Sequence, residues 1–355
     1  MNTQSPDGHT TMDNTGLPTA IGVDLGGTRF KVGWLSSQYE LQAAETYPTF
    51  GHRPVEDVLV EIANAITTAR EAADSAGHPI GAVGIGMAAV IDPNAGKIVL
   101  APNFSQSWQQ FPLASALQRM TSLPVYLLND ARSHLLAEWR AGAARNIANV
   151  LGITLGTGVG GGLVLDGRLR LGPHCLAGEF GHLTCDPHGL RCGCGSFGCV
   201  ETYASGTAIA AAALRPLLQG RTPRLREVLG GDSSRLDAQA VAQAALLGDT
   251  ECSDIFARAG EALGIGIANV MKIVEVERVV IGGGVAAAEN LLFDAIRRSI
   301  RRHCTVFEGC EPDLTTATVA QPGATGAAIW ARERMNVMAR LSERSSDLSY
   351  LEAPQ

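Results

Sequence analysis

The chain has 355 residues, of which 46% are hydrophobic and 18% charged, a composition that is ordinary for a globular protein and long enough for two domains. Its formal net charge of −7 argues against a nucleic-acid or anionic-membrane partner. Glycine is in excess, with 41 residues, but no Gly-X-Y period or abundance of proline indicates a fibrous or low-complexity chain. The excess must therefore be explained by what glycine does at particular positions.

The chain begins with a polar segment, MNTQSPDGHTTMDNTGLP, that contains no Lys or Arg and no apolar run. Residues 1–18 are therefore predicted to form a disordered leader rather than a signal or transit peptide. The longest uncharged stretch, residues 146–165, is too rich in glycine for a membrane span. We expect a cytoplasmic protein whose thiols are kept reduced.

The first half of the chain alternates strands and helices. Residues 20–35, AIGVDLGGTRFKVGWL, are two β-type runs joined by Gly26-Gly27, which is a hairpin signal. Apolar side chains then recur at helical spacing. The segments predicted after the hairpin are a helix from Val55 to Gly77, a strand at 80–87, a short helix at 113–120, a strand at 124–128 and a helix at 131–142.

A second module comes next and opens with a similar hairpin, whose predicted strands, 150–155 and 162–167, flank the sequence GTGVGGG. A Cys- and Gly-rich insertion runs from His174 to Cys199. Two α/β halves with similar opening hairpins describe this pattern. The remaining predicted segments are helices near 203–219, 237–247 and 251–273, the strand ERVVIGGG, a helix at 289–302, the strand LTTATVA and a last helix at 324–341.

The two glycine-rich hairpins are predicted to bind phosphate. GTGVGGG contains G-x-G-x-x-G, but a strand follows it, whereas a dinucleotide fold requires a helix. A tip without Cβ atoms lets backbone N–H groups approach an anion closely, and a merely flexible turn is the alternative. Asp24, just before the first tip, is a candidate to hold Mg²⁺ through water. The turn VVIGGGVAA at 279–287 either packs against a nucleotide's ribose or adenine or only joins a strand tightly to a helix.

The spacing of His182, Cys192, Cys194 and Cys199 fits a structural Cys₃His zinc site with four protein ligands. A disulfide is the alternative, but a Cys-x-Cys bridge closes a strained ring, and disulfides are rare in the cytosol. The neighbouring residues His174, Cys175, Cys185 and His188 are spare candidates as ligands.

Acidic side chains beside this cluster suggest a polar binding site. Glu179 precedes His182 by three residues, so the two share a face in a helical turn, and Glu201 follows Cys199 closely. With Asn129 and Asp130 at a strand's carboxyl end, they would suit a polyhydroxylated substrate, because each hydroxyl needs a donor and an acceptor. Taken singly, either glutamate would be interpreted as a solvated surface acid.

These motifs together resemble the ROK family of bacterial sugar kinases and repressors over about residues 20–340. The resemblance rests on GVDLGGTRFKVG, LLNDARSHLLAEW, LGITLGTGVGGGLVLDG, AGEFGHLTCDPHGLRCGCGSFGCVETYASG, IGGGV and GATGAA. It implies an α/β, actin-like ATPase (ribonuclease-H-like) fold, in which two α/β domains with a cleft between them bind ATP, Mg²⁺ and a hexose. The implied domains are residues 19–130, joined by the C-terminal helix 324–341, and residues 131–323, with the zinc insertion at 174–201 and a tail at 342–355.

The resemblance also implies residue roles. Asp130 would be the general base that takes the proton from the sugar hydroxyl. The sugar would be bound by Asn103, Asn129, Asp130, Glu179, His182 and Glu201. Phosphates, Mg²⁺ and adenosine would be held by Asp24, Gly26, Gly27, Thr28, Gly156, Thr157, Gly158, Gly160, Gly283 and Gly284.

The implied activity is ATP-dependent phosphorylation of a hexose at the 6-hydroxyl, with glucose as the first candidate substrate. Mannose, fructose, N-acetylglucosamine and N-acetylmannosamine are alternatives, as is polyphosphate in place of ATP. Where the family usually has Pro-Gly beside the sugar, this chain has Ala88-Ala89. That change also leaves open a non-catalytic sugar-responsive regulator, whereas a repressor would need a DNA-binding domain larger than the 18-residue leader. The resemblance implies a homodimer or homotetramer.

Overall fold

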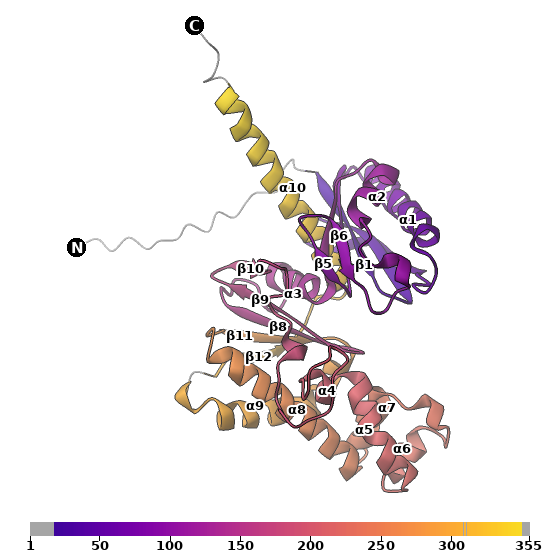
Figure 1. Cartoon of the computed structure of the whole chain (residues 1–355), viewed down its shortest axis with the longest axis vertical. Coiled ribbons are helices and arrows are strands. Elements are labelled where there is room, and N and C mark those ends of the chain that lie inside the picture. Colours follow the sequence, from indigo (N-terminus) through magenta and orange to yellow (C-terminus); the bar gives the residue numbers. More distant parts are fainter. Residues whose placement is uncertain (1–17, 308, 310, 350–355) are drawn as a thin grey trace, which may run out of the picture.

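A computed structural model of the chain describes residues 18–307, 309 and 311–349. Figure 1 shows two lobes of strands and helices, with α10 (Pro322–Ser349) returning from the second lobe to the first. None of the helices in the described residues is long and apolar enough to cross a membrane. The predicted disordered leader lies outside the described residues except for Pro18.

Each lobe is built on a five-stranded sheet, and the two sheets have the same plan. Their orders are β3-β2-β1-β4-β7 and β10-β9-β8-β11-β12. In both, an antiparallel hairpin opens the sheet and two parallel strands follow on its other side. The strands of the first sheet are β1 (Thr19–Leu25), β2 (Arg29–Leu35), β3 (Leu41–Pro48), β4 (Ile80–Met87) and β7 (Val125–Asn129). Those of the second are β8 (Val150–Leu155), β9 (Val159–Leu165), β10 (Arg168–Arg170), β11 (Arg278–Gly282) and β12 (Asp313–Thr316).

The helices that cover the two sheets differ between the lobes. The first lobe has α1 (Val55–Ser75), α2 (Leu113–Thr121) and a small β5-β6 hairpin (Val90–Asp92 and Lys97–Leu100). Between β10 and β11 the second lobe inserts a loop and then a group of helices. These are α4 (Glu201–Ala204), α5 (Gly206–Leu218), α6 (Pro223–Val228), α7 (Ala238–Leu246) and α8 (Thr250–Met271), and α9 (Glu289–His303) comes after β11.

Helix α10 packs closely on the first sheet because two strand glycines make room for it. A Cβ on Gly22 of β1 would overlap the carbonyl oxygen of Ala324, and one on Gly84 of β4 would overlap that of Ala327. Removing both Cβ atoms lets the helix backbone rest directly on the strands. The C-terminal helix therefore belongs structurally to the first lobe.

Helix α3 (Asp130–Ala141) lies between the lobes and shares a core with α10. Leu135, Leu136 and Trp139 of α3 are buried against residues of both sheets and of α10. Each lobe also has a larger core of its own. The first residues of α3 are thus held in a fixed position with respect to both sheets.

The chain passes between the lobes at 142–149 and again at 317–321, and one buried carboxylate binds both crossings. Glu138 of α3 is 2% exposed. Its Oε2 accepts from the Ala143 backbone N–H at 2.8 Å, and its Oε1 accepts from those of Thr318 and Val319 at 2.9 and 2.7 Å. A buried carboxylate requires such donors to offset the loss of hydration.

Most predicted segments are confirmed, and four of them differ clearly in extent from the prediction. Strand β9 begins at Val159 rather than 162, and the predicted helix 203–219 is divided at Ser205, whose extended backbone and side-chain cap begin α5. Strand β12 ends at Thr316, short of the predicted 320. Helix α10 runs from 322 to 349 rather than 324 to 341, so residues 342–349 of the predicted tail are helical, and 350–355 lie outside the described residues.

Candidate active site and metal centre

Asp130 is the first residue of α3 and comes directly after the carboxyl end of β7. Its side chain is half-buried, and among the described residues no donor makes a hydrogen bond to its carboxylate. A carboxylate at a helix N-terminus lies in the favourable field of the helix dipole. Asp130 is therefore placed to accept a proton from a bound molecule.

Asn129 is fixed by two contacts of its side-chain amide. Its Oδ1 accepts from the Arg132 backbone N–H at 3.3 Å and caps α3, while its Nδ2 donates to the carbonyl of Ala89 at 3.3 Å. Ala89 itself is buried. The Ala88-Ala89 segment thus contributes a backbone carbonyl that orients Asn129, whatever side chains occupy those positions.

Asp24 lies near the end of β1, close to both Asp130 and the start of α10. Its carboxylate lies within 3 Å of the place a Cβ would occupy on Gly323. Burial raises the pKa of Asp24, and the charge of Asp130 raises it further, while His134 and Lys31 act in the opposite direction. Two neighbouring carboxylates favour a cation between them, since a positive charge restores the ionised form.

The first hairpin tip is bound to the loop that carries Asn103. A Cβ on Gly27 would come 2.9 Å from the Asn103 carbonyl oxygen, so only a glycine permits this approach. The carbonyls of Gly27 and Thr28 accept from the backbone N–H groups of Gly51 and Thr49, at 2.8 and 2.9 Å. The segment after β3 therefore joins the tip to the rest of the lobe.

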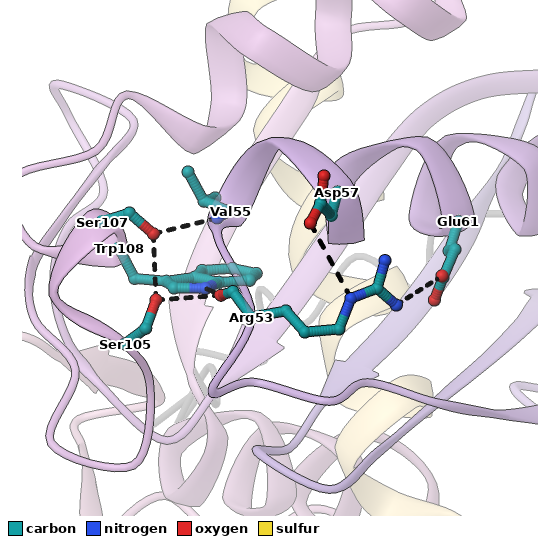
Figure 2. Close-up of polar contacts among 7 residues, drawn as sticks. All are labelled: Arg53, Val55, Asp57, Glu61, Ser105, Ser107 and Trp108. Atoms are coloured by element: carbon teal, nitrogen blue, oxygen red, sulfur yellow. Dashed lines mark hydrogen bonds and ion pairs between the residues drawn. The ribbon is translucent and has the colours of Figure 1, made fainter.

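Figure 2 shows how residues 53–55 of that segment contact Ser105, Ser107 and Trp108, which follow Asn103 in the segment between β6 and α2. Ser107 Oγ accepts from the Val55 backbone N–H at 2.9 Å and so caps α1 from a distant part of the chain. Ser105 Oγ donates to the carbonyl of Arg53 at 2.9 Å, and the Trp108 indole N–H reaches the same carbonyl at 3.4 Å. These contacts join the segment that carries Asn103, a candidate sugar ligand, to the segment that supports the first hairpin tip, a candidate phosphate site.

The second hairpin tip is held against the N-terminus of α5. The Gly156 carbonyl accepts from the Gly206 backbone N–H at 2.7 Å, and the Thr157 carbonyl accepts from the Thr207 hydroxyl at 2.8 Å. The described side chains leave the space around Gly156 open, because nothing lies within 4 Å of where its Cβ would be. The tip is therefore both fixed and accessible, as an anion site requires.

The other glycines predicted to bind phosphate or adenosine differ in their surroundings. Gly160, predicted to bind phosphate, lies within β9, where a Cβ would stand 2.6 Å from both the Ala131 Cβ and the Thr154 hydroxyl. It lets α3 pack onto the strand next to Asp130. Of the predicted adenosine residues, Gly283 has φ +92 and passes over Leu155 at the end of β8, whereas Gly284 has open space around it.

The structure brings together the four predicted metal ligands, His182, Cys192, Cys194 and Cys199. Their donor atoms all lie within 4.8 Å of one another. The His182 Nδ1 lies 3.7 Å from Cys192 Sγ, and the Cys194 and Cys199 Sγ atoms are also 3.7 Å apart. Ligands about 2.3 Å from a tetrahedral zinc lie roughly 3.8 Å from one another. The spare candidates Cys175, Cys185, His174 and His188 are not part of the cluster.

The ionisation of these thiols also favours a bound cation. Burial raises the pKa of Cys199 to about 12 and raises that of Cys192, while a backbone N–H of the Ser196 peptide lowers the pKa of Cys194. Three thiolates this close repel one another, and a divalent cation offsets that repulsion.

Glu201 connects the metal cluster to the second hairpin tip. Its Oε2 accepts from the Val159 backbone N–H at 2.9 Å, and its Oε1 lies 3.7 Å from Cys192 Sγ. A Cβ on Gly158 would come 2.6 Å from the same carboxylate. The candidate sugar residue Glu201 thus has a second role in holding the tip, which sequence spacing did not indicate.

Sequence reasoning missed Arg132. This arginine, two residues after Asp130, forms an ion pair with Glu179 at 2.9 Å. The partners are 47 residues apart, so no local pattern predicts their contact. The presence of an arginine on an otherwise apolar face of α3 was the signal available, because a buried guanidinium requires a partner.

Known proteins resemble this chain over most of its length. The ROK family profile matches residues 20–334. A glucokinase of Streptomyces coelicolor is 34% identical over 325 residues, 90% of this chain and 99% of that protein. An N-acetylmannosamine kinase of Escherichia fergusonii is 31% identical over 274 residues, which are 77% of this chain and 86% of that protein. The crystal structure of a ROK glucokinase from Streptomyces griseus with glucose and AMPPNP superimposes with a TM-score of 0.76 at 33% identity, covering 89% and 99% of the two chains. These likenesses confirm the predicted two-domain, actin-like ATPase fold.

Proposed function

The chain belongs to the ROK family, and from this membership we propose that it is an ATP-dependent hexokinase that phosphorylates glucose at the 6-hydroxyl. Relatives named as glucokinases match almost their whole length to it. A related glucokinase structure holds glucose and an ATP analogue in the same fold. The two domains supply the two sides of such a site.

The observation that carries the proposal is the free carboxylate of Asp130 at the head of α3, next to Asp24 of the first hairpin. As general base, Asp130 would take the proton of the sugar 6-hydroxyl while that oxygen attacks the γ-phosphorus of ATP and ADP leaves. Phosphoryl transfer depends mainly on in-line positioning and charge neutralisation. A carboxylate base adds on the order of 10²–10⁴-fold to the rate.

The two hairpin tips would hold the phosphates from opposite sides. Gly26, Gly27 and Thr28 form the first tip, and Gly156, Thr157 and Gly158 the second. Asp24 would bind Mg²⁺, which neutralises charge on the phosphates when it is bound with ATP. The adenosine would lie over Gly283 and Gly284, the second of which has no neighbour to block it.

The sugar would be bound by residues from both lobes, namely Asn103, Asn129, Asp130, Glu179, His182 and Glu201. Four of these are already fixed by contacts within the chain. Gly27 approaches Asn103, Ala89 and Arg132 hold Asn129, Arg132 holds Glu179, and the Val159 N–H holds Glu201. A preformed set of acceptors reduces the ordering cost of binding a polyhydroxylated ligand.

The Cys₃His cluster would hold a structural zinc ion, because its donor set and spacing fit a closed tetrahedral site. With His182 Nδ1 directed at the cluster, the other ring nitrogen stays available to donate a hydrogen bond. The metal would thereby fix the orientation in which His182 meets the sugar.

A coupled assay of ADP release over a sugar panel tests the proposal. The panel contains glucose, mannose, fructose, N-acetylglucosamine and N-acetylmannosamine, each with ATP and with polyphosphate. We expect the highest kcat/KM with glucose and ATP. No turnover of any sugar would refute the kinase function.

N-acetylmannosamine is the second candidate substrate, because a kinase for that sugar matches 77% of the chain at 31% identity. A kcat/KM for N-acetylmannosamine above that for glucose would favour it.

We also propose that the protein is a cytoplasmic homodimer or homotetramer. Light scattering on the purified protein and cell fractionation test these two points.

A further inference from the structure

Arg132 is a nearly buried cation on the sugar side of the proposed site. Its side chain is 4% exposed, whereas that of its partner Glu179 is 40% exposed. The guanidinium Nη2 lies 2.9 Å from Glu179 Oε1. One end of the pair is therefore closed within the protein, and the other faces outward.

The guanidinium also binds the loop that leads to Glu179. Its Nε and Nη2 donate to the carbonyl of Ala177 at 3.2 and 3.0 Å. The backbone N–H of Arg132 donates to Asn129, so the residue contacts both segments that carry proposed sugar ligands. Arg132 thus ties the loop before Glu179 to the helix that begins with Asp130.

Fold stability alone is a poor explanation for this pair. Desolvating a guanidinium can cost more than a half-exposed partner returns, and apolar residues often replace buried ion pairs without loss of stability. The geometry has a clearer use in ligand binding. With Oε1 held by Arg132, the Oε2 atom of Glu179 is oriented but has no protein donor among the described residues.

We propose that Arg132 is a positioning residue for hexose binding, which holds the Glu179 carboxylate so that its second oxygen accepts hydrogen bonds from sugar hydroxyls. The inference rests on the proposed function. A fixed, ionised carboxylate only accepts, so it favours ligand positions that carry a hydroxyl donor. The hydrogen bonds of the guanidinium within the described residues go to Ala177 and Glu179 and not to the hairpin tips that would bind ATP, so we expect the effect on the sugar and not on the nucleotide.

The test is a mutant cycle measured by steady-state kinetics with glucose and ATP. The variants are Arg132→Met, Arg132→Lys, Glu179→Gln and the double variant Arg132→Met/Glu179→Gln. Arg140→Met is the matched control, since Arg140 also lies on α3 and pairs with a glutamate, Glu333, at the other end of the helix. Circular dichroism of each variant reports whether it folds.

We expect Arg132→Met to raise the KM for glucose about 10- to 100-fold, a range typical of a misplaced binding group. The kcat should stay within about threefold, and the KM for ATP should not change. Arg132→Lys keeps the charge but not the fork of donors, so its KM should be intermediate. In the Glu179→Gln background the effect of Arg132→Met should fall to about twofold, because the two residues act as one unit.

Additive effects of the two substitutions, or an unchanged KM for glucose in Arg132→Met, would overturn the inference while leaving the kinase function intact. An equal rise in KM for Arg140→Met would also overturn it. If Arg132→Met does not fold, the cycle is measured with Arg132→Lys, for which the same coupling with Glu179→Gln is expected and additivity is again fatal. A wild-type protein that phosphorylates no sugar would overturn the proposed function, and this inference with it.

Discussion

The two sheets share one strand plan, but the residues after their last strands differ. In the first lobe β7 ends at Asn129 and leads directly into Asp130 and α3. In the second lobe β12 ends at Thr316 and is succeeded by Ala317 and the crossing to α10. The common plan brings both hairpin tips to comparable places. The segments that the lobes do not share supply the proposed base and most of the proposed sugar ligands.

A second difference lies in the segment after the third strand of each sheet. After β3 the chain runs into α1, whereas after β10 it forms the Cys₃His cluster and five α-helices before returning to the sheet. Glu179, His182 and Glu201 all come from that insertion. A duplicated scaffold therefore carries unlike halves of one site, in the way that function is commonly grafted onto a fold.

The largest expected effect comes from replacing Asp130, because the second lobe has no acidic residue directly after the last strand of its sheet. Asp130→Asn should lower kcat about 10²- to 10⁴-fold, because the amide cannot accept the sugar proton. Glucose binding, measured by calorimetry, should be retained within about tenfold. Thr316→Ala, at the corresponding strand end of the second lobe, should leave kcat within about twofold. Equal losses in both variants would contradict the difference between the lobes.

The second prediction concerns the Cys₃His cluster, which lies in the insertion of the second lobe. Elemental analysis should find about one zinc per chain, and Cys194→Ser should remove most of it. Since the proposed metal would orient His182, glucose affinity should fall about 10- to 100-fold, as when an orienting contact at a metal site is lost. Cys175→Ser, in the neighbouring loop outside the cluster, is the control. Wild-type protein purified without any metal would refute the zinc site.

We expect Glu138 to stabilise the joint between the lobes, because its carboxylate accepts hydrogen bonds from both crossings. Replacing it with Gln puts an amide group opposite a backbone N–H and leaves that donor without a partner, which costs about 2 kcal/mol of the free energy of unfolding. Urea denaturation measures this change. Glu333→Gln, in a half-exposed pair with Arg140, should cost at most about 0.5 kcal/mol. A loss no larger for Glu138→Gln than for Glu333→Gln would show that the crossings do not depend on the buried carboxylate.

The sequence was most informative where local patterns carry the information. The glycine tips of both hairpins and the spacing of Cys192, Cys194 and Cys199 depend on neighbouring residues, and the structure contains both features. The residues at which strands and helices begin and end were less predictable. Gly160 was interpreted as part of a turn, because a strand glycine required for the approach of Ala131 looks the same in sequence as a flexible one.

Contacts between distant segments were not predictable. Glu138 meets Thr318 across 180 residues, and Arg132 meets Glu179 across 47, so neither pair leaves a periodic or spacing signal. Both residues lie on α3, where a buried charged side chain indicates that it has a partner but not which residue that partner is. Their partners become visible only when the fold has placed the two crossings and the loop before Glu179 against α3.

The smallest expected effect concerns how helices begin in the two lobes. Helix α7 is capped by its own Asp237, which accepts from the Ala240 N–H at 2.8 Å, whereas α1 is capped by Ser107 from a segment 52 residues away. Ser107→Ala and Asp237→Ala should each cost about 1 kcal/mol, the usual value of an N-cap. Only Ser107→Ala should also raise the KM for glucose, by about two- to threefold, because Ser107 (Figure 2) lies in the same segment between β6 and α2 as Asn103. Urea denaturation and kinetics on the two variants separate these effects. If both variants left the KM unchanged, the distant cap would serve α1 alone, and the contacts from Arg53 to Trp108 would have no part in sugar binding.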